Sequence, residues 1–198
     1  SPKSGRPRVT GMRGFTSAIA RRSGSRAAAK KGSSLAPAWT PNERKPCSSG
    51  GAVAEATRGA GAGSRYLFYV TLGSGVGGGF VAKGKLFHAA KPGESEIGLC
   101  LLDREGATVE SRCSGWAVDR RMRSLLERGA VARPEGWRED TTGQEARFLG
   151  PLIERGDPAA IALLGEISED LAFGLSHVAQ LLHPDRVVLG GGLSLIGE

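Results

Sequence analysis

Hydrophobic patterning changes character along the chain. An apolar, β-branched and aromatic run at 66–72 predicts a strand, and a second such segment follows at 80–82. A Lys83-Gly84-Lys85 turn then leads into another extended segment at 86–88. Further on, apolar residues recur at three- and four-residue steps, which predicts a long amphipathic helix with the core positions Ile161, Leu164, Ile167, Leu171, Leu175, Val178 and Leu182.

Local signals set the limits of the predicted elements. Ser114 can cap a helix that runs through Leu126, and Asp157-Pro158 supplies a cap and a first-turn proline for the long helix, which His183-Pro184 ends. Short strands are expected at 101–103 and, buried, at 186–189, with a loop over 131–147. The charged face formed by Asp119, Arg120, Arg121 and Arg123 is expected to be solvated, as is Glu94.

Between the first two extended segments lie five glycines, namely Gly73, Gly75, Gly77, Gly78 and Gly79. Such a loop lets backbone N–H groups approach an anion without obstruction by Cβ atoms. The glycines match a dinucleotide fingerprint and most of a P-loop, but both motifs require a helix next, whereas the pattern predicts strands. We therefore expect a glycine loop between antiparallel strands. It either cradles a phosphate or is a hairpin with no ligand.

Four segments in order carry a family resemblance. Residues 70–79 resemble the phosphate loop of the ROK family of bacterial sugar kinases and repressors, and 96–99 resemble its sugar-binding Glu-x-Gly-His element, with Leu99 in the His position. Residues 114–117 resemble the Ser-Gly-x-Ala start of the next helix, and 187–192 resemble the strand and turn that meet the nucleoside. The resemblance implies an α/β, actin-like ATPase (ribonuclease H-like) fold. That fold is expected to be incomplete here and to consist mainly of the C-terminal sugar- and nucleotide-binding domain.

The resemblance also implies a site. The resemblance assigns phosphate binding to Gly73, Ser74, Gly75, Val76, Gly77 and Gly78. It assigns sugar binding to Glu96, Gly98 and Glu110, and nucleoside binding to Gly190, Gly191 and Gly192. A carboxylate beside a glycine suits sugar hydroxyls, although Glu96 can also be read as a surface acid and Glu110 as a helix N-terminal acid. ATP and Mg²⁺ are the implied cofactors. A sugar is the implied substrate, and members of the family are often homodimers.

No zinc is expected. Many ROK proteins bind zinc through a cysteine run plus the His of Glu-x-Gly-His, but Gly106–Glu110 stand in place of that run, and Leu99 stands in place of the His. Tetrahedral zinc needs four N or S ligands. Cys113 is expected to be a buried, small apolar residue.

The resemblance weakens before residue 51. Residues 52–56 resemble the helix that follows the catalytic Asn-Asp-Ala-Asn loop, and counting back places Cys47 at the catalytic Asp. The family's first phosphate loop, Asp-x-Gly-Gly-Thr, has no counterpart. No catalytic residue is therefore assigned, and whether the chain is an enzyme stays open. The expected organisation is a foreign or frame-shifted segment at 1–50 and a ROK-type domain fragment at 51–198.

Charge divides the chain at the same point. Residues 1–50 hold 11 Lys and Arg against Glu43 alone, a balance of +10, whereas the remainder holds 16 basic and 19 acidic residues. The first segment lacks apolar periodicity, so we expect it to be disordered. It is a nucleic-acid-binding tail, an inert tail or a non-natural segment; we favour the last, so that any nucleic-acid binding would be nonspecific.

Composition also bears on location. The sequence contains three cysteines, widely spaced, which suggests a reducing cytoplasm. It has no apolar run of about 18 residues, so no membrane partner is expected.

Three hypotheses for function follow. The chain derives from a glucokinase-like, ATP-dependent sugar kinase and is itself inactive, or it derives from a sugar-responsive repressor, or it is a non-catalytic sugar-binding module. A kinase would transfer a phosphoryl group from ATP to a sugar hydroxyl.

Overall fold

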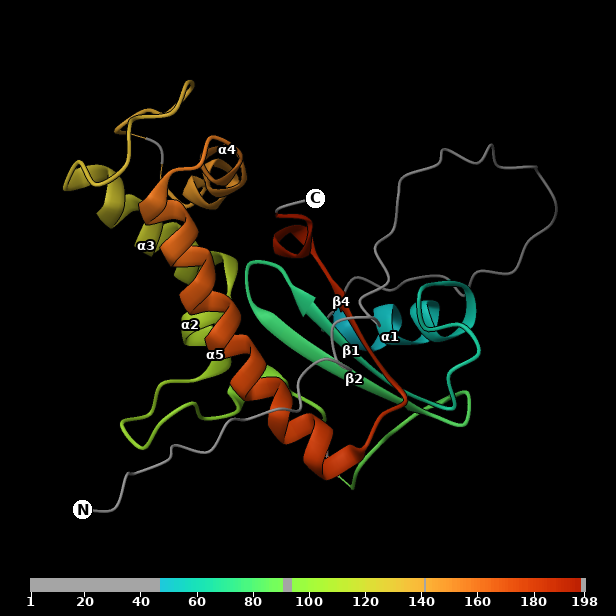
Figure 1. Ribbon diagram of the computed structural model, residues 1–198. Coiled ribbons are helices and arrows are strands. Elements are labelled where there is room, and N and C mark those ends of the chain that lie inside the picture. Colours follow the sequence, from blue (N-terminus) through green and yellow to red (C-terminus); the bar gives the residue numbers. More distant parts are fainter. Residues whose placement is uncertain (1–46, 91–93, 141, 197–198) are drawn as a thin grey trace, which may run out of the picture.

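A computed structural model describes residues 47–90, 94–140 and 142–196 of the chain (Figure 1). Four strands form one sheet in the order β3-β2-β1-β4. Strand β1 (Tyr66–Leu72) pairs antiparallel with β2 (Val76–Ala82) and parallel with β4 (Arg186–Gly190). The short β3 (Lys85–Leu86) continues the sheet beyond β2. The predicted strand, turn and strand pattern is therefore confirmed, although β3 is shorter than expected.

Helices cover both faces of this sheet. Leu67 of β1 packs with Ala52 of α1 (Cys47–Arg58) on one face, together with Val81 and Val188. The alternate β1 side chains Phe68 and Val70 enter the main core on the other face. Figure 1 shows α1 on one side of the sheet and the long α5 on the other. Because both faces are buried, β1 is a continuous apolar run and does not alternate with polar residues.

The helices of the main core begin and end where their capping residues predict. Ser114 Oγ accepts a hydrogen bond from the Ala117 amide at 3.2 Å at the start of α3 (Gly115–Glu127). Asp157 Oδ1 accepts from the amides of Ala159 and Ala160 at the start of α5 (Pro158–Leu182). His183 closes α5 in the left-handed conformation, with φ of 44°. The shorter helices are α2 (Val109–Cys113) and α4 (Leu149–Glu154), with 3-10 turns η1 (Ile97–Leu99), η2 (Glu145–Phe148) and η3 (Gly192–Leu195).

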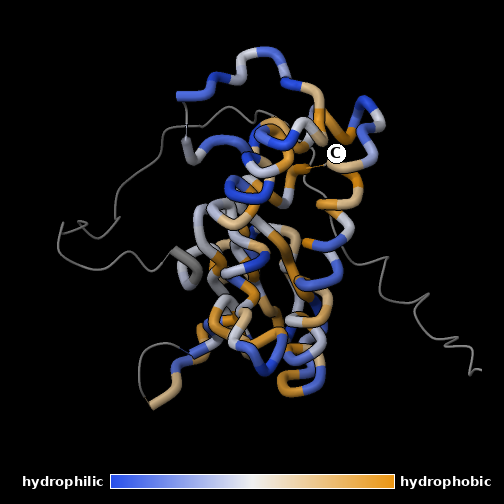
Figure 2. The backbone as a smooth tube through the Cα atoms, turned by 90° about the vertical axis from the view of Figure 1, so that its left-hand side faces the viewer, coloured by the Kyte–Doolittle hydropathy of each residue, from blue (hydrophilic) through white to orange (hydrophobic). Residues whose placement is uncertain are grey.

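Helix α5 corrects two predicted core positions, Ile161 and Leu164, and the second of these is only half-buried and does not pack with the main core. Hydrophobic and hydrophilic residues alternate along it, as Figure 2 shows. Ile161 is 48% exposed, and Leu163 is buried in the main core. In the first turns of α5 the apolar stripe is so wide that either of two helix faces could be buried. Packing against the core selects the face with Ala160 and Leu163.

Two predicted strands also differ. Residues 101–103 form no strand, because Leu101 makes a single bridge to Thr108. In β4 only Val188 is buried. Among the described strands β4 lies at the edge of the sheet. The other residues of β4 are therefore covered on fewer sides than the prediction of a buried strand assumed.

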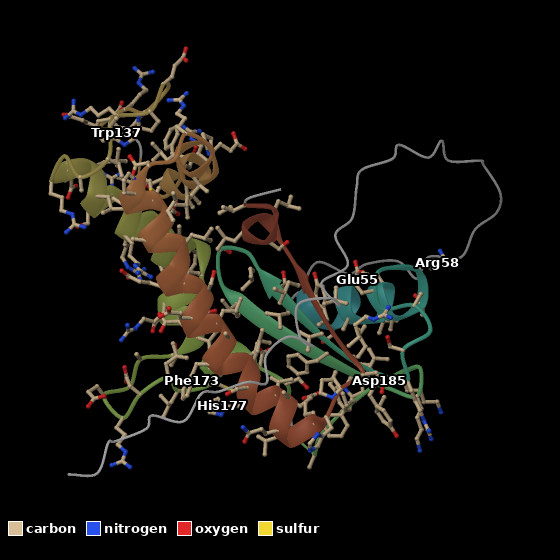
Figure 3. All side chains as sticks on the ribbon, viewed as in Figure 1. Glu55, Arg58, Trp137, Phe173, His177 and Asp185 are labelled. Carbon is tan, nitrogen blue, oxygen red and sulfur yellow. The ribbon has the colours of Figure 1, made fainter. Side chains whose placement is uncertain are left out.

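Asp185 joins the starts of β1 and β4. The Oδ2 atom of Asp185, which is labelled in Figure 3, accepts from the amides of Arg65 and Tyr66 at 2.9 and 2.8 Å. Arg186 donates to the Ala60 carbonyl. Across the turn after α1, Glu55 accepts from the Ala60 amide at 2.8 Å. These bonds fix the parallel register that brings the carboxyl ends of β1 and β4 together.

Helix α1 begins at Cys47, a few residues before the predicted boundary at 51. The predictions for residues 1–46, disorder among them, lie outside the described residues. No helix in the described ranges is long and apolar enough to cross a membrane.

Candidate functional site

The predicted glycine loop is a tight turn, shorter than expected. Strand β2 starts at Val76, so that only Gly73, Ser74 and Gly75 form the connection. Gly77, Gly78 and Gly79 pair within the sheet. A Cβ on Gly78 would lie 2.1 Å from the Ser95 carbonyl oxygen, which explains why a glycine occupies this strand position.

The N-terminal end of helix α3 holds this turn in place. The Gly115 amide donates to the Gly73 carbonyl at 2.7 Å, and the Trp116 amide donates to the Ser74 carbonyl at 3.3 Å. Gly115 permits the contact, since a Cβ there would lie 2.7 Å from the Gly73 oxygen. Within the described part of the chain, the Ser74 and Gly75 amides have no hydrogen-bond partner. They are therefore the donors that the turn can offer to a ligand.

The predicted sugar residues lie against the same turn. Glu110 Oε2 accepts from the Val76 amide at 2.9 Å, and a Cβ on Gly75 would lie 2.6 Å from that oxygen. Gly98 packs on the Val76 carbonyl, 2.1 Å from where its Cβ would be. The fold thus brings residues from three separate sequence segments onto the start of β2.

Glu96 shares this acidic environment. Burial raises the pKa of its carboxyl, and the nearby charges of Glu110 and Glu94 raise it further. Glu94 is not solvated as expected: its side chain is 17% exposed and lies 2.9 Å from His88 Nδ1. Carboxylates in such a group suit a ligand rich in hydroxyl donors.

The turn also lines a cavity of about 660 Å³. Gly73 and Ser74 line it together with Gly192, one of the predicted nucleoside residues. Gly190 and Gly191 have a different role. Gly190 lies against the Tyr69 ring, and Gly191, with φ of 91°, packs on the Leu72 backbone. The remaining walls come from α3, η2, α4 and η3, and include Trp116, Asp119, Gln144, Arg147, Glu154, Leu193, Leu195 and Ile196.

Arg120 is exposed, as expected of the charged face of α3, but Asp119 and Arg123 of the same face instead bind η2, which forms one wall of the cavity. Asp119 is 8% exposed and accepts from the Ala146 amide at 2.7 Å. Arg123 pairs with the buried Glu145. Burial opposes the charge of Glu145, but hydrogen bonds from its own amide, the Gln144 amide, Arg123 and the Gly143 amide lower its pKa below the ordinary value.

Sequence reasoning therefore missed Trp116, Asp119 and Arg123. Their spacing of three and four residues places them on one face of α3. That spacing was visible in the sequence, but their partners at 143–147 are distant in the chain and follow no pattern. Contact with the cavity could not be read from the helix alone.

Two residues bear on the expectation that no zinc binds, namely Leu99, which stands in the position of the family's His, and Cys113, which was expected to be a buried apolar residue. Leu99 is 70% exposed, and Cys113 is fully buried, as expected, with Sγ 3.6 Å from the Ile167 carbonyl oxygen. Burial and the charge of Asp170 raise the pKa of the Cys113 thiol to about 12. Among the described residues no group of three or more side chains could hold a metal ion. The absence of zinc stays a prediction.

Known proteins resemble this chain in sequence. The sequence model of the ROK family matches residues 48–198. A glucokinase of Halalkalibacterium halodurans is 28% identical over 161 residues, which are 74% of this chain and 47% of that protein. A xylose repressor of Caldicellulosiruptor bescii is 24% identical over 141 residues, 67% of this chain and 35% of that protein.

A solved structure agrees in fold. A ROK family glucokinase from Streptomyces griseus, in complex with glucose and AMPPNP, matches with a TM-score of 0.62 and 28% identity over 72% of this chain and 50% of that one. The predicted actin-like α/β fold is confirmed. The chain spans about half the length of the curated relatives that it matches.

Proposed function

The chain belongs to the ROK family, and from this premise we propose that it forms part of the ATP- and sugar-binding cleft of a sugar kinase. The activity proposed for the whole protein is phosphoryl transfer from ATP to a hydroxyl of a hexose. A cytoplasmic location and a homodimer are part of the same proposal.

The Gly73–Gly75 turn is the observation that carries it. Gly73 and Ser74 line the cavity together with Gly192, and the next residues, Gly75 and Val76, contact Glu110. Phosphoryl transfer needs the attacking hydroxyl and the phosphate to be adjacent and oriented. A turn shared by a cavity and by a group of carboxylates supports that adjacency.

Roles for the residues follow from their chemistry. The Ser74 and Gly75 amides would donate to phosphate oxygens, and Glu96 and Glu110 would accept from sugar hydroxyls. Glu96 serves best above its raised pKa, because only the ionised carboxylate is purely an acceptor. Mg²⁺, when bound, would neutralise phosphate charge, and it would be held largely by the phosphates and water.

In the transfer, the sugar oxygen bonds to the γ-phosphorus as the bond to ADP breaks, and the hydroxyl proton passes to a base. The family resemblance places Cys47 at the position of that base. Loss of a general base costs about 10²- to 10⁴-fold in rate. We therefore propose that this 198-residue chain binds both ligands but does not turn them over.

Calorimetric titration tests binding, with ATP and Mg²⁺ and with glucose, mannose and N-acetylglucosamine in turn. We expect ATP and at least one sugar to bind, and a coupled ADP-release assay to stay at background. Glu110→Gln should weaken sugar binding on the order of 10-fold, since it replaces charged hydrogen bonds by neutral ones. Glu105→Gln, at an exposed turn, is the matched control. If neither ATP nor any of the sugars binds, the proposal is overturned. If ADP is released above background, the chain has an active general base and the proposed lack of turnover is wrong.

The similarity to a xylose repressor favours a second candidate, a sugar sensor. A sensor needs the carboxylates but has no use for a phosphate-binding turn. Sugar binding without any ATP binding would select this candidate over the kinase.

A further inference from the structure

We propose that the indole of Trp116 is the stacking surface for the base of the bound nucleotide. This inference rests on the proposed function and assigns base recognition to a residue of this chain. Trp116 is 63% exposed and lines the cavity that Gly73, Ser74 and Gly192 also line. A tryptophan with that much apolar surface in water stabilises a fold little, but it gains much when a flat ligand covers it.

The position of Trp116 is fixed from two sides. Its own amide donates to the Ser74 carbonyl at 3.3 Å, so its backbone adjoins the turn whose Ser74 and Gly75 amides have no partner among the described residues. One helical turn further, Asp119 accepts from the Ala146 amide at 2.7 Å and ties α3 to the facing wall. An aromatic ring held on a rigid helix loses little conformational entropy when a ligand stacks on it.

The end of α3 itself is not an anion site. Its amides at Gly115 and Trp116 are committed to carbonyl groups of the turn, and the Ala117 amide is committed to Ser114 Oγ. The helix can therefore serve the cavity only through its side chains, and Trp116 is the aromatic one among those that line it.

The chemistry of the cavity selects the kind of ligand. Amide donors at the turn suit an anion, whereas Trp116 and the apolar Leu193, Leu195 and Ile196 suit a flat, weakly polar ring. A nucleoside polyphosphate carries both parts in one molecule. A hexose has no anionic group, and an inorganic polyphosphate has no flat, weakly polar ring. A volume of about 660 Å³ falls within the range of small-molecule sites.

The test compares ATP with inorganic tripolyphosphate, which keeps the phosphates and lacks the base. Calorimetric titrations use the full chain, wild type and Trp116→Leu, which retains an apolar side chain without the ring. We expect the ATP Kd of Trp116→Leu to rise about 5- to 100-fold, the range typical of lost base stacking, with the tripolyphosphate Kd unchanged. Trp116→Phe should fall between the two.

Trp137→Phe is the matched control. Trp137, labelled in Figure 3, packs against the main core. The guanidinium carbon of Arg133 lies 4.8 Å from its ring centroid, and Trp137 is not among the residues that line the cavity. This control should leave both Kd values unchanged. Thermal denaturation of Trp116→Leu should match the wild type, because the side chain is largely exposed.

The outcomes separate the two proposals. If ATP binds and Trp116→Leu changes nothing, or weakens ATP and tripolyphosphate equally, the stacking role is wrong and the proposed function stands. If the variant instead weakens glucose binding alone, the ring contacts the sugar and the inference is overturned. If the wild-type chain binds neither ATP nor tripolyphosphate, the proposed function fails and the inference fails with it.

Discussion

At the scale of single residues, Ser95 carries backbone strain beside the candidate sugar residues. Its φ of 64° lies in the left-handed region, which costs a residue with a Cβ about 1–2 kcal/mol. We expect Ser95→Gly to raise the free energy of unfolding by about 0.5–1 kcal/mol, since glycine removes this strain but adds freedom to the unfolded chain. Urea unfolding measures the change. Ser95→Ala, which keeps the strain, should stay near the wild type; a gain equal to that of glycine would contradict the explanation.

Glu145 makes a pH-dependent contribution to stability. Its pKa is lowered in the folded state, so the unfolded chain binds a proton more readily. The stability from this group is therefore present above its ordinary pKa of 4.5 and is lost as the pH falls through the lowered value. Glu145→Gln should lower the free energy of unfolding at pH 7 by about 1–3 kcal/mol.

The same variant should lose less stability than the wild type between pH 5 and pH 3, because no carboxylate is left to protonate at this position. Thermal denaturation across this pH range measures both effects. Glu139→Gln is the control, since Glu139 forms an exposed pair with Arg133 and contributes little. An equal acid dependence in wild type and Glu145→Gln would contradict the role of the buried carboxylate.

At the scale of elements, two glycines of α5 should respond in opposite ways to the same substitution. A Cβ on Gly165 meets no atom within 4 Å, so Gly165→Ala should raise stability by about 0.5–1 kcal/mol through helix propensity. A Cβ on Gly174 would lie 2.6 Å from Val109 Cγ2, and Val109 is fully buried. Gly174→Ala should therefore destabilise by about 1 kcal/mol or more through overpacking.

Urea midpoints of the two α5 variants provide the measurement. Each variant is the control for the other, because both substitutions are in the same helix and each adds one methyl group. Two gains of similar size would show that α2 and α5 do not pack as closely at Gly174 as the structure places them.

At the scale of the whole molecule, the core spans both faces of one sheet and reaches from α1 to η3. We predict that limited trypsin digestion trims the basic segment before residue 47 and leaves a resistant product that begins close to α1. The reason is compositional: the first 50 residues hold 11 Lys and Arg and no apolar periodicity. N-terminal sequencing and mass spectrometry of the product give the cut site. A protected fragment from within the first 40 residues would contradict the prediction.

The sequence by itself determined features whose causes are local. The caps Ser114 and Asp157, the helix end at His183 and the strand at 66–72 depend on residues within a few positions of each other, so patterns revealed them. The motif order was likewise enough to identify the family and hence the fold. Strand limits were harder to predict, because Gly77–Gly79 have little intrinsic strand preference and enter β2 only by pairing with β1.

Only the tertiary structure decided what depends on partners far apart in the chain. Asp119 and Arg123 were expected to be solvated, and they are held by Ala146 and Glu145, more than 20 residues away. The cavity exists because the parallel pairing of β1 with β4 brings Gly192 beside the Gly73–Gly75 turn. Burial and the pKa shifts it causes are sums over such distant neighbours. Periodicity along the chain carries no information about them.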